Sequence, residues 1–206
     1  MGTAIDTLVL HYTGMRTARA ALERLCDPMA EVSAHYLITR DGTVWCLVPE
    51  AARAWHAGVS GWRGATALNG CSIGIELVNP GHEFGYVGFA AAQMRATIGL
   101  CAGILGRWPI DPRRIVGHSD IAPDRKQDPG EKFPWPRLAA AGIGLFPAGR
   151  TPPRAAPEAL LRAIGYPTER PGCVGAFQRR FRPARVDGVV DEETHERLQA
   201  VADAFG

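Results

Sequence analysis

The stretch from Ile115 to Asp128, IVGHSDIAPDRKQD, constrains the fold of this chain more than any other. A short apolar run passes there into a segment punctuated by Gly and Pro, a pattern that predicts a buried strand followed by a loop. The loop brings together His118, Lys126 and Asp128. Histidine and aspartate are both competent zinc ligands, and a catalytic zinc typically has three protein ligands and one position left to water. We therefore interpret the stretch as part of a zinc site.

A third ligand has to come from elsewhere in the chain. The best candidate is His11, which follows the apolar run from Thr7 to Leu10 and can be aimed into a cleft from the end of a strand. The alternative is a core histidine and a turn aspartate with no metal. Spacing alone does not decide between the two.

Length and charge narrow the classes of protein. The 206 residues suffice for one medium domain and one small one, with enough apolar residues for a hydrophobic core. A formal net charge of +2 gives no reason to expect a nucleic-acid partner or a polybasic membrane surface. No apolar run approaches the roughly 18 residues that a membrane span needs. We expect a monomer without a membrane segment.

Two features favour a cytoplasmic location. The chain starts without a basic segment followed by an apolar stretch, so no export signal is expected. Its five cysteines show no CxxC spacing and fit reduced thiols better than a disulfide framework. A periplasmic or cell-envelope location is the alternative if residues before the first strand have been trimmed.

Local patterns predict an α/β fold, with a central mixed sheet flanked by helices. Apolar and turn signals predict strands at Ile5–His11, 32–39, 43–48 and Ile73–Val78, with a tight hairpin turn at Asp41-Gly42. Residues 59–69 show no periodicity and are predicted to be a loop. Helices are expected after Thr17, a capping residue, and from Phe89 to Arg107, where apolar residues recur at helical spacing.

The composition changes in the last third of the chain. Residues 1–147 are predicted to form the main domain, and residues 148–157, rich in Pro and small residues, a semi-rigid linker. Residues 158–206 contain three short helical patterns, the last capped by Asp191, and predict a small three-helix domain.

Four motifs in the main domain resemble a known family. They are LVLHYTG at 8–14, AWHAG at 54–58, SIGIELVNPG at 72–81 and GHSDIAPDRKQDPG at 117–130. In this order they are similar to the zinc N-acetylmuramoyl-L-alanine amidases of the amidase-2 type, which are related to phage lysozymes and peptidoglycan recognition proteins. The resemblance covers the first two thirds of the chain. Residues 158–206 resemble the peptidoglycan-binding type 1 domain; a helical unit that only packs on the core is the alternative.

The resemblance implies roles for five residues. His11, His118 and Asp128 match the three zinc ligands of the family. Glu76 matches the catalytic glutamate, which takes a proton from the attacking water and passes it to the leaving amine. Lys126 matches a position whose ammonium stabilises the oxyanion at the attacked carbonyl. On residue type alone, Glu76 is equally a solvent-facing residue at a sheet edge and Lys126 an ordinary surface lysine.

Substrate contacts are expected from the loops. Trp55 and His56 resemble the groove wall of the family, where an aromatic face packs on a sugar and an imidazole bonds a polar group. Asn79 is expected to bond the peptide backbone, although Asn-Pro-Gly is also an ordinary turn. Arg125 can pair with a stem-peptide carboxylate. His35 is expected to be a buried structural residue, and His82 and His195 are assigned to the surface.

The implied reaction is hydrolysis of the amide bond between N-acetylmuramic acid and L-alanine of peptidoglycan stem peptides, in cell-wall recycling or turnover. Muropeptides are then the partners and Zn²⁺ the cofactor. The residues do not choose between ordinary and 1,6-anhydro muramic acid. A non-catalytic recognition protein shares the fold and is the alternative function, although its class commonly lacks part of the metal site.

Overall fold

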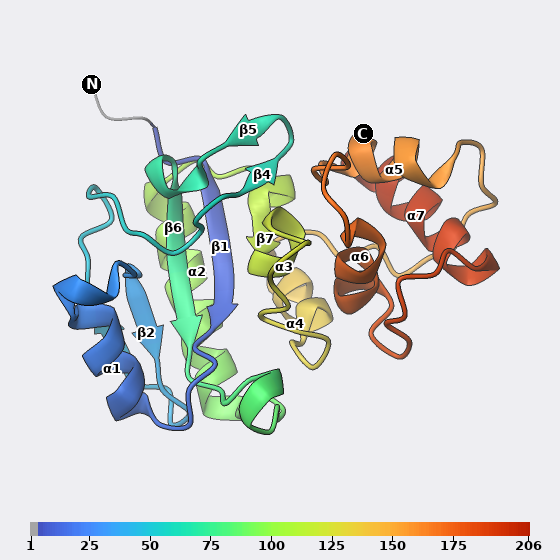
Figure 1. Cartoon of the computed structure of the whole chain (residues 1–206). Coiled ribbons are helices and arrows are strands. Elements are labelled where there is room, and N and C mark those ends of the chain that lie inside the picture. The colour runs from blue at the N-terminus through green and yellow to red at the C-terminus, as the bar shows by residue number, and fades with distance from the viewer. Residues whose placement is uncertain (1–3) are drawn as a thin grey trace.

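A mixed five-stranded sheet forms the centre of the molecule in the computed structural model, which describes residues 4–206 (Figure 1). The strand order is β3-β2-β6-β1-β7, with β1 at Thr7–Tyr12, β2 at Tyr36–Ile38, β3 at Val44–Cys46, β6 at Ser72–Leu77 and β7 at Ile115–Gly117. Neighbouring strands are parallel except for the edge pair β2 and β3. The predicted α/β class and the hairpin between β2 and β3 are confirmed.

Strands β1 and β6 place alternate residues on opposite faces of the sheet. On one face, Leu8 and Leu10 of β1 join Ile73 and Ile75 of β6 in the core beneath helix α2 (Ala91–Arg107), which lies behind the sheet in Figure 1. The residues between them face the other way. In the parallel register of the two strands, His11 is paired with Glu76. Two polar residues therefore stand side by side at the ends of two buried strands.

The other elements of the main domain agree with the sequence in part. Helix α1 (Ala18–Cys26) is capped by Thr17, whose hydroxyl accepts from the Ala20 amide at 3.1 Å, as predicted. The predicted loop 59–69 is wrong in part, because it contains a two-stranded hairpin of β4 (Gly61–Trp62) and β5 (Ala65–Thr66). Arg63 and Gly64 both have positive φ, as a tight hairpin turn requires, and strands of two residues are too short to show periodicity.

His118 does not lie in a loop, as the Gly and Pro punctuation suggested. It begins helix α3 (His118–Ile121), directly after β7. Asp120 explains the helical turn, because its carboxylate accepts a hydrogen bond from the Gly117 amide at 2.8 Å and closes the start of the helix. Helix α4 (Trp135–Ala140) follows after the loop that carries Asp128.

The three predicted C-terminal helices are present as α5 (Pro157–Ile164), α6 (Cys173–Phe181) and α7 (Glu192–Phe205). The preceding segment is packed against them. Phe146 stacks on Phe181 with 5.7 Å between ring centroids, and the Thr151 amide donates to the Glu196 carbonyl at 3.2 Å. Residues 148–157 therefore run along the C-terminal helices and do not act as a free spacer.

One hydrophobic core joins the C-terminal unit (residues 157–206) to the main domain. Trp62 and Ile121 of the main domain share this core with Leu161 and Phe177 of the C-terminal helices. Helix α6 lies beside α3 in Figure 1. Within the described residues, no helix is long and apolar enough to cross a membrane. The two parts are distinct in the chain but continuous in their packing.

We predict that deleting residues 157–206 strongly destabilises the remainder. The deletion exposes Trp62 and Ile121, which are almost completely buried. Each large apolar side chain returned to water costs about 1.5–3 kcal/mol, against a total stability of about 5–15 kcal/mol for a typical domain. The melting temperature of the truncated chain should fall by about 10 °C or more, or the chain should aggregate. An unchanged melting temperature would refute the shared core; Arg162→Ala, on the exposed side of α5, is the control.

Candidate metal and catalytic site

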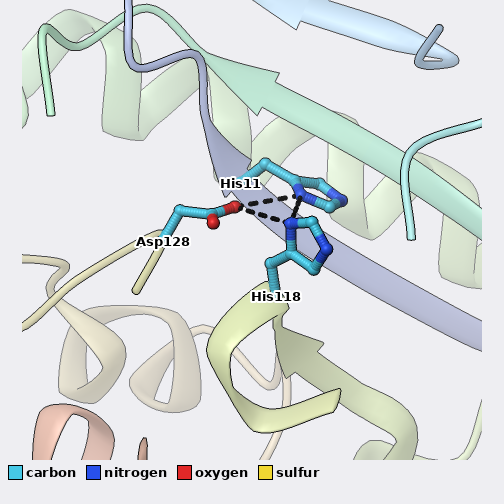
Figure 2. A group of neighbouring side chains, drawn as sticks. All are labelled: His11, His118 and Asp128. Atoms are coloured by element: carbon cyan, nitrogen blue, oxygen red, sulfur yellow. Dashed lines mark hydrogen bonds and ion pairs between the residues drawn. The ribbon is translucent and has the colours of Figure 1, made fainter. Parts of the chain in front are cut away.

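Three polar side chains converge where β1, α3 and the following loop meet. His11 lies near the end of β1, His118 is the first residue of α3, and Asp128 lies in the loop beyond (Figure 2). The two histidine Nδ1 atoms are 2.9 Å apart, and each lies 3.1 Å from Oδ2 of Asp128. All three residues are buried. The structure thus brings together the three predicted metal ligands, although 107 residues separate the two histidines.

The hydrogen-bond network leaves Nδ1 of His118 without a proton. Its other ring nitrogen, Nε2, faces the Ala57 carbonyl at 3.2 Å. A carbonyl only accepts, so Nε2 carries the proton and donates it there. In the neutral ring, Nδ1 then presents a lone pair to His11 and Asp128.

A second series of hydrogen bonds leaves Nδ1 of His11 without a proton as well. Ser72 donates its hydroxyl proton to the Leu68 carbonyl at 2.6 Å, so its oxygen accepts from Nε2 of His56 at 3.2 Å. Nδ1 of His56 is then an acceptor for Nε2 of His11 at 3.0 Å. His11 therefore presents a bare Nδ1 on its other side. His56 thereby orients a candidate ligand, and it also lines the cleft, where the substrate contact was predicted.

Three lone pairs face one another at this point and have no proton to share. Burial and the neighbouring His118 lower the pKa of His11 to about 4, which favours the neutral ring. Two neutral imidazoles and one carboxylate fit a divalent cation with a position left for water or substrate.

The His56 ring fits into the site because residue 74 of β6 is a glycine. A Cβ atom at this position would lie 2.4 Å from the His56 ring, which is closer than any side chain tolerates. Ser72, Gly74 and Glu76 alternate along the same strand and therefore share one face. The sequence reasoning missed Ser72 and Gly74. The polar and small residues at every second position of the apolar strand SIGIEL were the available signal.

Glu76 lies on the rim of the same site. It lines a cleft of about 700 Å³ together with His118, Asp128 and Lys126. Its Oε2 atom is buried and has no hydrogen-bond partner within residues 4–206. Burial, with a smaller contribution from the charge of Asp128, raises the pKa of Glu76 well above its ordinary value. A carboxyl group in this environment is suited to hold and release a proton.

The predicted substrate contacts occupy different places. Arg125 lines the cleft, and its guanidinium also donates to the Ala57 and Val59 carbonyls. Trp55 is 51% exposed but lines a neighbouring hollow of about 260 Å³. Asn79 is a correction: it is completely buried, donates to the Val87 carbonyl and accepts from the Gly81 amide. These bonds occupy its amide in shaping a turn.

The remaining histidines divide between structural and cleft positions. His35 is buried, accepts from the Gly74 amide and faces the Ala52 carbonyl, which confirms its structural role. His82 is exposed as predicted but also lines the cleft, where it bonds Tyr12 and Glu131. His195 faces the Ala155 carbonyl, away from the site.

Two histidines and an aspartate that can hold a metal ion, beside a buried carboxyl group in an open cleft, are typical of metal-dependent hydrolases. Residues 1–131 match the family described as N-acetylmuramoyl-L-alanine amidase. The chain belongs to this amidase family, as its four motifs suggested.

Two relatives illustrate the similarity in sequence. In an alignment of 234 positions, the chain is 40% identical to the N-acetylmuramoyl-L-alanine amidase AmiD of Escherichia coli K12. The alignment covers 98% of this chain and 84% of that protein. It is 42% identical over 107 residues to the 1,6-anhydro-N-acetylmuramyl-L-alanine amidase AmpD of the same strain, covering 52% of this chain and 56% of that protein. The similarity to AmiD therefore extends through the C-terminal helices.

Solved structures share the whole architecture. AmiD of E. coli, in complex with the substrate anhydro-N-acetylmuramic acid-L-Ala-D-gamma-Glu-L-Lys, superposes with a TM-score of 0.87 at 39% identity and covers all of this chain and 91% of its own. AmpDh3 of Pseudomonas aeruginosa, in complex with an anhydromuramic pentapeptide, has a TM-score of 0.88 at 36% identity and covers 100% and 94%.

We predict that Ser72→Ala weakens metal binding about tenfold, because partners that orient a metal ligand typically contribute 10–100-fold to affinity. The substitution removes the acceptor that fixes the proton on His56 and, through it, the bare nitrogen of His11. Competition with a chromophoric chelator measures the affinity. Thr97→Val, which also removes a buried hydroxyl bonded to a backbone carbonyl, should leave it unchanged. Equal affinities in all three proteins would contradict this role.

Proposed function

We propose that this amidase binds Zn²⁺ and hydrolyses the amide bond between N-acetylmuramic acid and L-alanine in free muropeptides, including those with 1,6-anhydro muramic acid. The observation that supports it most is the set of three ligand atoms within 3.1 Å of one another, beside the buried Oε2 atom of Glu76. The substrates named for AmiD and AmpDh3 support the anhydro form.

His11, His118 and Asp128 would hold the zinc ion. Zinc at this site supplies Lewis-acid polarisation of the scissile carbonyl and lowers the pKa of water. Glu76, whose raised pKa favours proton uptake, takes the proton of the attacking water and delivers it to the departing alanine nitrogen. Lys126 lines the cleft and stabilises the negative charge that develops on the attacked oxygen.

The cleft also contains groups that fit the rest of a muropeptide. Arg125 donates to two backbone carbonyls through Nη2, and we assign its Nη1 group to a carboxylate of the stem peptide. Trp55 offers an exposed aromatic face beside the cleft for a sugar ring. In the C-terminal unit, a hollow of about 360 Å³ between α5 and α6 is the proposed contact for larger wall fragments.

The first prediction of this proposal concerns the reaction itself. Purified protein incubated with anhydro-muropeptides should release the intact stem peptide and the sugar, both identified by mass spectrometry. Chelation should abolish the release, and zinc should restore it. His118→Ala should bind no stoichiometric zinc, because two remaining protein ligands rarely retain a catalytic ion. Release of the same products by the zinc-free protein would contradict the proposal.

The second prediction concerns Glu76. Glu76→Gln keeps the size of the side chain but cannot carry the proton, so turnover should fall about 100-fold or more while zinc content is unchanged. Glu83→Gln, also on the cleft wall, is the matched control and should retain turnover within a few-fold. Near-normal turnover of the zinc-loaded Glu76→Gln protein would assign the proton transfer to another residue.

A further inference from the structure

A buried network of three charged and polar groups joins the C-terminal unit to helix α3. Oδ1 of Asp120 accepts from the Tyr166 hydroxyl at 2.8 Å, and Oδ2 accepts from Nη1 of Arg180 at 3.0 Å. The Asp120 and Arg180 side chains are 1% and 2% exposed. Tyr166 and Arg180 both belong to the C-terminal unit, whereas Asp120 lies two residues after His118.

The helical turn that contains Asp120 begins at one candidate metal ligand, His118, and is hydrogen-bonded to the backbone of another, Asp128. Oδ2 of Asp120 also accepts from the Gly117 amide at 2.8 Å, which fixes the turn where His118 begins. The amide of Ser119, two residues after Gly117, donates to the carbonyl of Asp128 at 2.8 Å. A shift of this turn would therefore move the His118 ring and the backbone of Asp128 together.

Gly117 leaves this turn little freedom to take another position. A Cβ atom here would lie 2.6 Å from Cδ of Pro129, so the start of α3 is in close contact with the segment after Asp128. On its other side, α3 is tied to the C-terminal unit through the carboxylate of Asp120.

Arg180 is itself held in one position. Its guanidinium lies over the Trp135 ring, 4.1 Å from the centroid, and Nη2 donates to the Leu145 carbonyl at 3.2 Å. Tyr166 is fixed by an edge-to-face contact with Trp62, with 5.1 Å between centroids. Buried ion pairs often add little to stability compared with well-packed apolar groups, but they favour a specific geometry of hydrogen bonds. Tyr166 and Arg180 are the two fixed donors that hold the carboxylate of Asp120 between them.

We propose that Tyr166 and Arg180 are positioning residues for the metal centre: through Asp120 they set the orientation of α3, and hence of His118 and Asp128. The C-terminal unit then contributes to the metal site and is more than an attached binding module. The inference rests on the metal site of the proposed function but does not depend on the substrate.

Metal binding without substrate provides the test. Tyr166→Phe removes one hydrogen bond to Asp120 and keeps the ring, and Arg180→Met removes the charge. Both should bind Zn²⁺ about tenfold more weakly in competition with a chromophoric chelator, at a temperature where circular dichroism shows them folded. Arg180→Lys, which restores the charge but not the second donor arm, should recover part of the affinity. Visible absorption of Co²⁺ in the site should change in Tyr166→Phe, because it reports the coordination geometry.

The matched control is Arg182→Met in the same C-terminal unit. Arg182 is also a buried arginine with carboxylate partners, Asp191 and Glu193, but they belong to the region of α7. This variant should lose thermal stability and keep the Zn²⁺ affinity and Co²⁺ spectrum of the unaltered protein. Unchanged affinity in folded Tyr166→Phe, or an equal loss in Arg182→Met, would overturn the positioning role. Failure to cleave muropeptides with the affinity differences intact would reject the proposed substrate alone.

Discussion

Three ligand atoms with lone pairs and no shared proton, all within 3.1 Å of one another, place the strongest constraint on this structure. Such an arrangement is unfavourable in a buried site unless a cation lies between the atoms. The protein stabilises it by directing each proton outward, from His118 to a backbone carbonyl and from His11 to His56. The fold has to provide fixed acceptors on the far side of both rings.

The parallel pairing of β1 and β6 supplies much of this geometry. Because side chains alternate along a strand, the apolar residues of both strands anchor the sheet on α2 while the residues between them face the site. The same alternation aligns Ser72, Gly74 and Glu76 as an acceptor, a space for an imidazole and a proton carrier. Strand β6 thus contributes one face to the hydrophobic core and the other face to the candidate site.

The C-terminal helices extend this architecture. Their apolar side chains complete a core that includes Trp62 and Ile121, and two of their polar residues meet Asp120 inside it. The similarity to AmiD over 98% of the chain includes these helices, whereas the similarity to AmpD covers about half of it.

The sequence by itself indicated most of the local elements, the family and the three candidate ligands. Strand periodicity located His11 and Glu76 near strand ends, and the motifs around His118 and Asp128 carried their chemistry. Only the tertiary structure decided that His56 is hydrogen-bonded to His11, that Asn79 is enclosed in a turn, and that Asp120 pairs with Arg180. These outcomes depend on contacts between residues such as Asp120 and Arg180, 60 positions apart, and on which hydrogen-bond partners remain available once the sheet has formed. The sequence records residue type and spacing. Which ring nitrogen of a histidine carries the proton depends on the hydrogen-bond partners that lie beside it after folding.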